Sequence, residues 1–434
     1  MPPSVAVRRR TERSADGYVF VAPFVGKKNG TLMIVDDLGE PVWIHQNPLL
    51  LMNFKVQRLA GKPVLTWWEG RVVNGFFEGE CVIADTSYRV LKVIESTAGF
   101  QPEVHEFLIT ERGTALLSAN AFVSMDLTPY GGSAQGTVLD GVVQEIDITS
   151  GQLLYEWHSL DHVGLDETSV GVADVWDYFH LNSIDVDDDG NLLVSARYPS
   201  AVYKIDRKTG AVIWRLGGTK SDFELGPGAG FWFQHDARNR GGGLLSIFDD
   251  GADAPDNAPE PVSRAILLRL DTSALQASLV KEFANPTGAV SVAMGSAQEL
   301  YTGGYFVGWG TVPQMTEFAA DGTVVFDAAL PPGYFSYRAF RSQWPGRAPG
   351  SPAAATVRNA NGSIDVYVSW NGATRVAQWQ VVGGATETSM QPLKMEPRTG
   401  FETRIRISRP PAHLAVHALD AKGRTLGTSE TVTT

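Results

Sequence analysis

The feature that most constrains the fold is a repeated block of four strand-like runs. The clearest copy covers residues 180–216, where HLNSIDV, NLLVSAR, AVYKID and AVIWRL are separated by turn signals at about ten-residue spacing. Similar blocks occupy residues 51–95, 103–157, 233–283 and 289–327. A period of roughly 40–55 residues with four strands per block is typical of a β-propeller, in which each block forms one blade.

The first block is incomplete. Residues 17–46 contain the runs GYVFVAPF, GTLMIVDDLG and PVWIHQ, which align with the second, third and fourth strands of the other blocks. The missing innermost strand has one candidate, YFSYRAFR at residues 334–341. We therefore predict an all-β fold in which this late strand closes a six-bladed propeller over residues 15–347, after a flexible N-terminus at 1–14. Closure of the ring removes exposed sheet edges.

The composition changes after residue 345, where WPGRAPGSP reads as a linker. Short runs with strict alternation follow, such as SIDVYVSW and FETRIRIS. Several short strands in a segment of this size are typical of a small β-sandwich of the immunoglobulin or fibronectin III type. We predict such a domain at residues 348–434, with a structural role.

Bulk properties exclude several function classes. The net charge of −12 argues against nucleic-acid binding, which favours a basic face. No apolar run reaches the roughly 18 residues of a membrane-spanning helix, so no membrane partner is expected. The N-terminal segment MPPSVAVRRRTERSADG lacks the apolar core of a signal peptide. We expect a cytoplasmic protein, or a secreted one if a leader has been removed, and favour a monomer.

Three histidines occur at the openings of three successive blocks: His105 in EVHEF, His180 in YFHLNSID and His235 in FQHDAR. The innermost strands of a propeller line its central channel, so these imidazoles are expected to converge there. Arg197 lies near the end of the next strand after His180. Convergent histidines beside an arginine are suited to handling a transferable anion.

Strand alternation refines the expected site. Residues i and i+2 of a strand face the same side, so His180 and Asn182 are expected to face the channel and Leu181 the blade interface. Asp236 is expected to face away from the channel and to act as a structural partner of Arg238 or a neighbouring backbone group.

Three histidines also match a zinc ligand set. The neighbouring arginine and amide disfavour a cation, so we predict neither a metal nor another cofactor. Aromatic residues cluster near strand ends, and most of them are expected to pack in the core. Some are expected to form an apolar slot for an aromatic ring, namely Tyr178, Tyr198, Trp309 and Tyr337.

At these residues the chain resembles the arylsulfotransferase family, propeller enzymes that move a sulfuryl group between phenols without a nucleotide donor. The resemblance spans about residues 15–345 and includes HEF, WDYFHLNSID, SARYPSAVYKI, IWRLGG, FQHDAR and FVGWG. It implies that His235 takes the sulfuryl group as a transient sulfohistidine. It also implies roles in binding the sulfuryl oxygens and handling the phenol proton for His105, His180, Asn182 and Arg197.

One position departs from the family pattern. Family members often have a histidine directly after the arginine, where this chain has Tyr198. Two other functions therefore stay open. One is a lyase, cyclase or hydrolase that acts on an aromatic natural product in the same channel. The other is a propeller that binds a ligand without catalysis.

Overall fold

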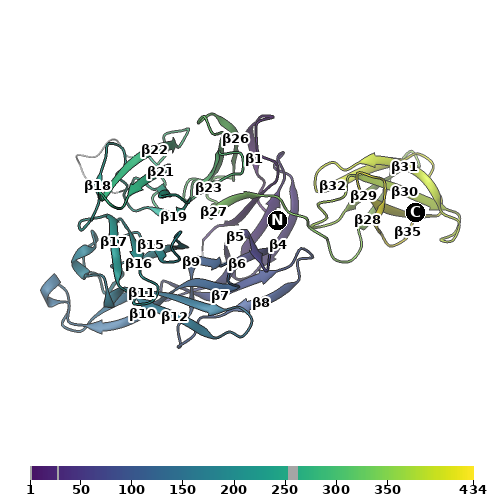
Figure 1. Cartoon of the computed structure of the whole chain (residues 1–434). Helices are drawn as coiled ribbons and strands as arrows, with labels where there is room; N and C mark the ends of the chain where they lie inside the picture. Colours follow the sequence, from purple (N-terminus) through teal and green to yellow (C-terminus); the bar gives the residue numbers. More distant parts are fainter. Residues whose placement is uncertain (1, 27–28, 253–261) are drawn as a thin grey trace.

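A computed structural model describes residues 2–26, 29–252 and 262–434 of the chain. The described residues form an all-β protein with a propeller-like arrangement of sheets and only three short 3-10 turns, η1 (Thr128–Tyr130), η2 (Ser159–Asp161) and η3 (Leu165–Glu167). Six sheets of four or five strands come first in the chain, and two small sheets follow residue 347 (Figure 1).

Five sheets follow the predicted blocks. The first three contain, in order, β5 (Leu50–Leu59), β6 (Lys62–Val73), β7 (Phe76–Ala84) and β8 (Val90–Ile94); β9 (Pro102–Ile109), β10 (Thr114–Met125), β11 (Gly136–Asp147), β12 (Leu153–His158) and the short β13 (Val175–Trp176); and β14 (Leu181–Val186), β15 (Leu192–Ala196), β16 (Ala201–Ile205) and β17 (Val212–Gly217). The next two contain β18 (Glu224–Leu225), β19 (His235–Asn239), β20 (Leu244–Asp249), β21 (Arg264–Asp271) and β22 (Gln276–Ala284); and β23 (Ser296–Glu299), β24 (Tyr305–Gly308), β25 (Gln314–Phe318), β26 (Val324–Ala329) and β1 (Ala6–Arg10).

The sixth sheet joins the two ends of this part of the chain. Its strands are β2 (Tyr18–Phe24), β3 (Gly30–Val35), β4 (Pro41–Asn47) and the late β27 (Phe335–Ser342). The pairing of β27 with β2 is antiparallel, with Tyr18 opposite Ser342 and Phe24 opposite Phe335. The prediction that the late strand completes the first block is confirmed.

The strand β1 corrects the prediction of a flexible N-terminus at residues 1–14. It pairs antiparallel with β26, from Ala6 opposite Ala329 to Arg10 opposite Phe326. The side chains of β1 are mostly exposed, because the strand lies at the edge of its sheet. No helix in the described parts of the chain is long and apolar enough to span a membrane.

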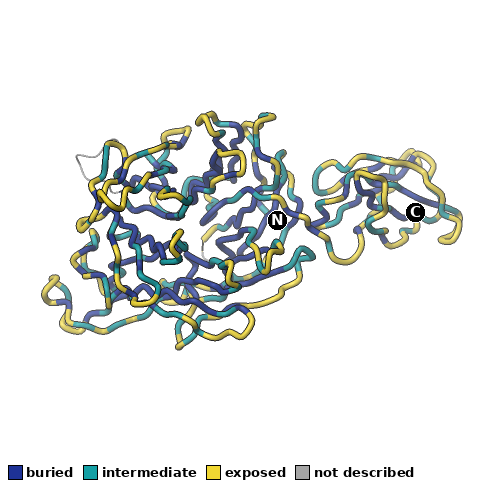
Figure 2. Tube along the Cα trace, viewed as in Figure 1, coloured by how far each residue is buried: buried dark blue, intermediate teal, exposed yellow. Residues whose placement is uncertain are grey.

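The innermost strands surround a common centre. In chain order β5, β9, β14, β19, β23 and β27 each contact the next, and β27 in turn contacts β5. Figure 2 shows that these inner strands are largely buried, whereas the connecting loops at the rim are exposed. Residues more than 200 positions apart in sequence therefore meet at the centre, where the candidate site lies.

Apolar side chains fill the spaces between neighbouring sheets. One cluster contains Leu116, Trp157, Phe179, Ile184 and Tyr203, which come from two adjacent sheets and from the segment between them. Burial of one such side chain contributes roughly 1.5–3 kcal/mol. This packing holds the inner strands rigidly, as a precise arrangement of polar groups at the centre requires.

Two small sheets form the C-terminal part. One contains β28 (Ala353–Arg358), β29 (Ile364–Ser369) and β32 (Glu402–Ile407), and the other β30 (Gln378–Gly384), β31 (Gln391–Pro397), β33 (His413–Leu419), β34 (Thr425–Thr428) and β35 (Val432–Thr433). Side chains from both sheets meet in one buried cluster, among them Val366, Ile405, Trp379 and Val416.

Candidate functional site

The three histidines named by the sequence lie together at the centre. The ring centroids of His105 and His180 are 4.8 Å apart, and those of His105 and His235 are 6.4 Å apart. The ring of Tyr337, from the late strand β27, lies 5.3 Å from that of His105. Four elements distant in sequence therefore each contribute a ring to one neighbourhood.

Carboxylates hold two of these imidazoles by Nδ1. Glu103, on the same strand β9, hydrogen-bonds Nδ1 of His105 through Oε2 and also accepts the backbone N–H of His105 at 2.9 Å. Asp177, before β14, lies with Oδ2 2.5 Å from Nδ1 of His180 and accepts its backbone N–H at 3.0 Å. A neutral imidazole that donates from Nδ1 presents an unprotonated Nε2.

His235 is held in the same way but is fully buried. Its Nδ1 lies 2.5 Å from Oδ2 of Asp250, and the backbone N–H of Met294 donates to its Nε2 at 3.3 Å. Because a backbone N–H only donates, Nε2 carries the lone pair and Nδ1 the proton. Burial, and then the positive charge of Arg197, lowers the pKa of His235 well below its ordinary value, so the ring is neutral.

The backbone at His180 changes which neighbours face the cavity. His180 has φ of +53° and precedes the first residue of β14, so strand alternation does not apply to it. Asn182 is fully buried, and its Nδ2 donates to the backbone carbonyl of Gln234 at 2.7 Å, so the prediction that it faces the same way as His180 is wrong. Leu181 packs in the buried apolar cluster between two neighbouring sheets, as predicted, and also borders the cavity.

Arg197 lies beside the histidines. Its Nη2 donates to the backbone carbonyl of Val292 at 2.7 Å, and its guanidinium stacks 4.4 Å from the ring centroid of Phe233. Its Nε is buried and has no hydrogen-bond partner among the residues that the structure describes. The ring of Tyr198 lies 4.7 Å from that of His180, so both predicted residues are close to the site.

A buried ionic cluster lies next to the histidines. Glu106 accepts a hydrogen bond from Nζ of Lys55 at 2.9 Å and further bonds from Arg238 and Arg338. Burial opposes ionisation of Glu106, but the three cations outweigh it and lower its pKa. Burial lowers the pKa of Lys55 to about 8. Since it binds three cations, Glu106 is not a partner of His105, in agreement with strand alternation.

The prediction for Asp236 is confirmed. Its Oδ1 accepts Nε of Arg238 at 2.8 Å, and its Oδ2 accepts the backbone N–H of Ala297 at 2.9 Å. Arg238 and Asp236 border a second depression of about 970 Å³, together with Lys55. The ionic cluster therefore lies between this depression and the histidines.

The cavity beside the histidines has a volume of about 120 Å³. Its polar wall consists of His105, His180 and the two carboxylates that hold them, with Asn120 from β10. Its apolar wall contains Phe76 and Phe77, at the tip of the β6–β7 hairpin, and Leu139. His235 does not line this cavity, and its Nε2 accepts the backbone N–H of Met294.

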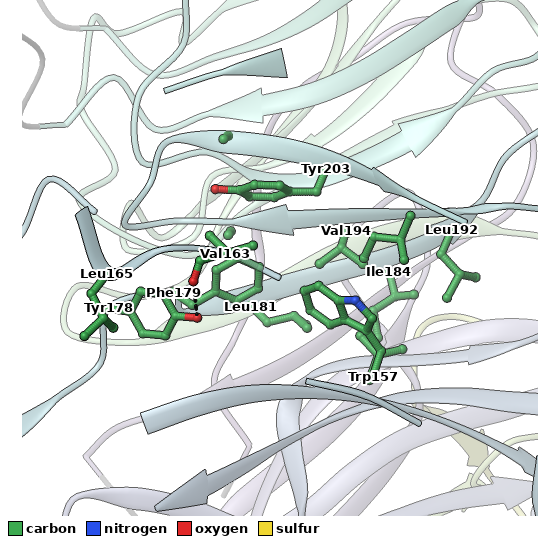
Figure 3. Close-up of a cluster of buried hydrophobic side chains, with 14 of the residues drawn as sticks. Trp157, Val163, Leu165, Tyr178, Phe179, Leu181, Ile184, Leu192, Val194 and Tyr203 are labelled. Carbon is green, nitrogen blue, oxygen red and sulfur yellow. Dashed lines mark hydrogen bonds between the residues drawn. The ribbon is translucent and has the colours of Figure 1, made fainter. Parts of the chain in front are cut away.

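Two predicted aromatic residues do not belong to the site. Figure 3 shows Tyr178 within a buried apolar cluster, where its hydroxyl donates to the carbonyl of Val163 at 3.3 Å. Trp309 is fully buried, packs on Phe248 and donates its indole N–H to Thr316 at 2.9 Å. Both pack in buried apolar clusters of the sheets, and the predictions that they bind substrate are wrong.

Within residues 2–26, 29–252 and 262–434 no three His, Cys, Asp or Glu side chains are arranged to hold a metal ion. The Nδ1 atoms of the three histidines are instead occupied by carboxylates. The arrangement can present an imidazole Nε2 lone pair, exchange a proton and offer a guanidinium to an anion.

Residues 55–330, well over half of the chain, match the family model described as Arylsulfotransferase (ASST). The chain belongs to the arylsulfotransferase family. All the site histidines and Arg197 of this chain lie within the matched residues. No curated protein sequence matches the chain.

Solved structures resemble the arylsulfotransferase chain only distantly. A protein of unknown function from Bacteroides caccae has 13% identity and a TM-score of 0.44, covering 75% of this chain and 100% of its own. A catalytically inactive virginiamycin B lyase from Staphylococcus aureus, with quinupristin, has 9% identity and a TM-score of 0.38, covering 85% of this chain and 97% of its own.

Sequence reasoning missed the carboxylates that hold the imidazoles, Glu103, Asp177 and Asp250. Glu103 and Asp177 precede their histidines by two and three residues, and that spacing was a usable signal. Asp250 follows His235 by 15 residues, after β20, and only the pairing of β19 with β20 brings the two together. Arg338 and the aromatic hairpin tip were also missed.

Proposed function

We propose that this arylsulfotransferase transfers a sulfuryl group from an aryl sulfate to a phenolic acceptor through a transient sulfohistidine at His235. The observation that carries the proposal is the state of that ring. His235 is neutral, its Nδ1 is held by Asp250, and its lone pair is on Nε2. A neutral nucleophile approaches a sulfate monoanion without charge repulsion.

In the first step the Nε2 lone pair of His235 attacks sulfur, and the bond from sulfur to the aryl oxygen breaks. The aryl oxygen leaves with the bonding pair and takes the Nε2 proton of His180 or His105, which begins this step as an imidazolium paired with its carboxylate and ends it as a neutral imidazole. The ring of His235 becomes positively charged as the N–S bond forms, and Asp250, 2.5 Å from Nδ1, stabilises this charge.

In the second step a phenol enters and gives its proton to the same histidine. Its oxygen attacks sulfur, the N–S bond breaks, and the electron pair returns to Nε2. One site therefore serves donor and acceptor in turn, which predicts ping-pong kinetics. The closeness of His105 and His180, at 4.8 Å between ring centroids, supports a shared role in moving this proton.

Arg197 is proposed to bind the sulfuryl oxygens. Its buried Nε has no partner in the described part of the chain, and its charge acts directly on His235. An unused guanidinium donor next to the nucleophile is suited to a transferring oxyanion. The N–H of Met294 must leave Nε2 for attack to occur, and the 3.3 Å length of that bond makes this a small cost.

We propose further that the six sheets are the blades of one propeller and that the C-terminal sheets form an immunoglobulin-like or fibronectin-like sandwich. The cyclic contacts of the inner strands and the single apolar cluster shared by the two small sheets support this. In this fold β27 contributes Tyr337 to the site from the end of the propeller.

A second candidate function is hydrolysis or elimination on an aromatic substrate. It is favoured by the cavity, which exposes His105 and His180 with their carboxylates rather than His235. Such an imidazole–carboxylate pair acts as a general base without forming a covalent intermediate.

One experiment separates the two functions. The protein is mixed with p-nitrophenyl sulfate, quenched within its first turnover and analysed by peptide mass spectrometry under mildly alkaline conditions. We expect one added SO₃ on the peptide that contains His235, and none in H235A, which should also release no p-nitrophenolate with phenols as acceptors. Product formation with no sulfated peptide would support the second function.

A further inference from the structure

The β6–β7 hairpin ends in two adjacent phenylalanines beside the catalytic cavity. We infer that Phe76 and Phe77 form the aryl-binding subsite of this enzyme and determine which phenols it accepts. This inference rests on the proposed function for its reaction, and it adds the residues that recognise the ring. The following structural observations carry it.

Phe76 and Phe77 line the same cavity of about 120 Å³ as His105 and His180. The cavity therefore has an apolar wall facing an imidazole wall. A phenol bound between the two walls would place its ring against the phenylalanines and its oxygen towards the histidines. The cavity volume of about 120 Å³ lies below the roughly 300–1,000 Å³ usual for drug-sized ligands, so the cavity suits a single phenol ring, and a second fused ring would extend out of its mouth.

Phe77 is fixed by contact with a buried tryptophan. Its ring packs edge to face on Trp68, with centroids 5.8 Å apart at 89°. The indole N–H of Trp68 donates to the carbonyl of Pro102 at 2.9 Å. Pro102 is the first residue of β9, the strand that carries His105. Trp68 thus links Phe77 of the apolar wall to β9, the strand that carries Glu103 and His105 of the polar wall.

Phe76 has a different support. Its ring packs edge to face on Phe122 of β10, with centroids 4.9 Å apart at 88°. Phe122 is 55% exposed. A large apolar side chain left in solvent beside a half-buried one extends the apolar surface out from the cavity mouth, and a second fused ring could cover it.

The hairpin is built so that its tip keeps this position. Gly70 pairs with Gly79 across the two strands, and a Cβ at either position would lie within 2.6 Å of the ring of Trp68. Trp68 therefore fills the space left by the paired glycines. The two-residue loop is Asn74-Gly75, with both φ values positive, which matches the tight turn preferred in hairpins.

The experiment compares F76A, F77A and F77L with a matched control, V73A, which changes the same hairpin tip but does not line the cavity. Two readouts are taken: kcat/KM for 2-naphthol relative to phenol with p-nitrophenyl sulfate as donor, and calorimetric binding of 2-naphthol without donor. We expect F77A to lose about ten-fold in naphthol binding and in naphthol preference, because a ring contact and its buried area are removed.

F76A is expected to lose naphthol preference while phenol turnover changes less, since Phe76 contacts the outer ring. F77L is expected to fall between wild type and F77A, which also shows that the hairpin still folds. V73A should match wild type in both readouts. Naphthol binding that falls in F77A when no variant transfers sulfate would refute sulfuryl transfer and support the aryl subsite. Binding and preference within two-fold of wild type in both F76A and F77A would overturn the subsite.

Discussion

The buried His235 and the cavity-facing pair His105 and His180 are all imidazoles paired with a carboxylate, but they differ in their exposure to solvent. Each imidazole has Nδ1 held by a carboxylate, so each would present Nε2. The side chain of His235 is 1% exposed, whereas that of His180 is 24% exposed and shares the cavity with His105. Burial and nearby cations keep His235 neutral.

This difference assigns different tasks to similar groups. Because its pKa is lowered by burial, the imidazole of His235 keeps its lone pair to a lower pH than an ordinary histidine does, which suits a nucleophile. An imidazole in contact with solvent can exchange its proton between turnovers, which an acid–base catalyst requires. Three histidines in one centre are therefore not three equivalent ligands, and each prediction below tests one side of the contrast.

The largest expected effect comes from Asp250. In D250N the amide carbonyl can still accept a hydrogen bond from Nδ1, but the amide carries no negative charge to stabilise the charged sulfohistidine. We expect kcat to fall on the order of 10³-fold, with a fold close to wild type because the amide has the same shape. Steady-state kinetics with p-nitrophenyl sulfate and a phenol measure this. A loss below ten-fold would mean that Asp250 does not act through a charged ring.

Next come the carboxylates of the cavity-facing pair. E103Q and D177N do not change the partner of His235, but they weaken the hydrogen bonds to Nδ1 of His105 and His180, the rings proposed to move the proton. We expect each to lower kcat roughly 10- to 100-fold, and more for acceptors with high phenol pKa, which depend most on a base. A series of substituted phenols gives the slope of log kcat against acceptor pKa. An unchanged slope in both variants would remove these histidines from proton transfer.

The pH dependence of the first step sharpens the contrast. The pKa of His235 lies well below 6.5, because the ring is buried beside Arg197, so the nucleophile stays unprotonated as pH falls. A histidine with an ordinary pKa of about 6.5 would lose about ten-fold in its neutral form at pH 5.5. With p-nitrophenyl sulfate, whose leaving group needs little acid, we expect the burst rate at pH 5.5 to stay within two-fold of that at pH 7.5. Stopped-flow absorbance measures this, and a ten-fold drop would contradict it.

The smallest effect concerns His158, an imidazole–carboxylate pair outside the cavity and a control for the others. Burial lowers the pKa of His158, but its hydrogen bonds to Asp140 and Glu156 outweigh burial and raise it overall. Its stabilising contribution is thus present below pH 6.5 and lost as pH rises through the raised value. Because solvent screens the pair, we expect H158Q to lower the free energy of unfolding by less than about 1 kcal/mol at pH 6 and by nothing at pH 9. Urea unfolding at both pH values checks the sign.

Strand cadence made much of the fold predictable. Turn signals between apolar runs mark the blocks well, and the lack of an innermost strand in the first block pointed to β27. The strand β1 was not predicted, because AVRRR is an exposed edge strand that pairs through its backbone and has no apolar alternation. Charged residues are common on edge strands, so a charged segment of this kind cannot be recognised as a strand from its composition alone.

The site was predictable where it depends on strand position and unpredictable where it depends on long-range pairing or backbone exceptions. The convergence of His105, His180 and His235 followed from the repeats. The orientation of Asn182 could not be predicted from the repeats, because the positive φ of His180 breaks the strand alternation on which the prediction relied. The hairpin tip carried a signal in Asn74-Gly75 between VV and FF, a pattern typical of a tight hairpin turn.

The late strand β27 has a consequence for biosynthesis. It supplies Tyr337 to the histidines and Arg338 to Glu106, more than 300 residues after β2, its pairing partner, has been made. A ribosome-bound nascent chain that has not yet emerged beyond residue 342 holds His105, His180 and His235 but lacks β27. It therefore lacks the ring of Tyr337 and the cation of Arg338, which joins Lys55 and Arg238 at Glu106. Completion of this centre is therefore a late event in synthesis, and partial translation products should be inactive even though every histidine is present.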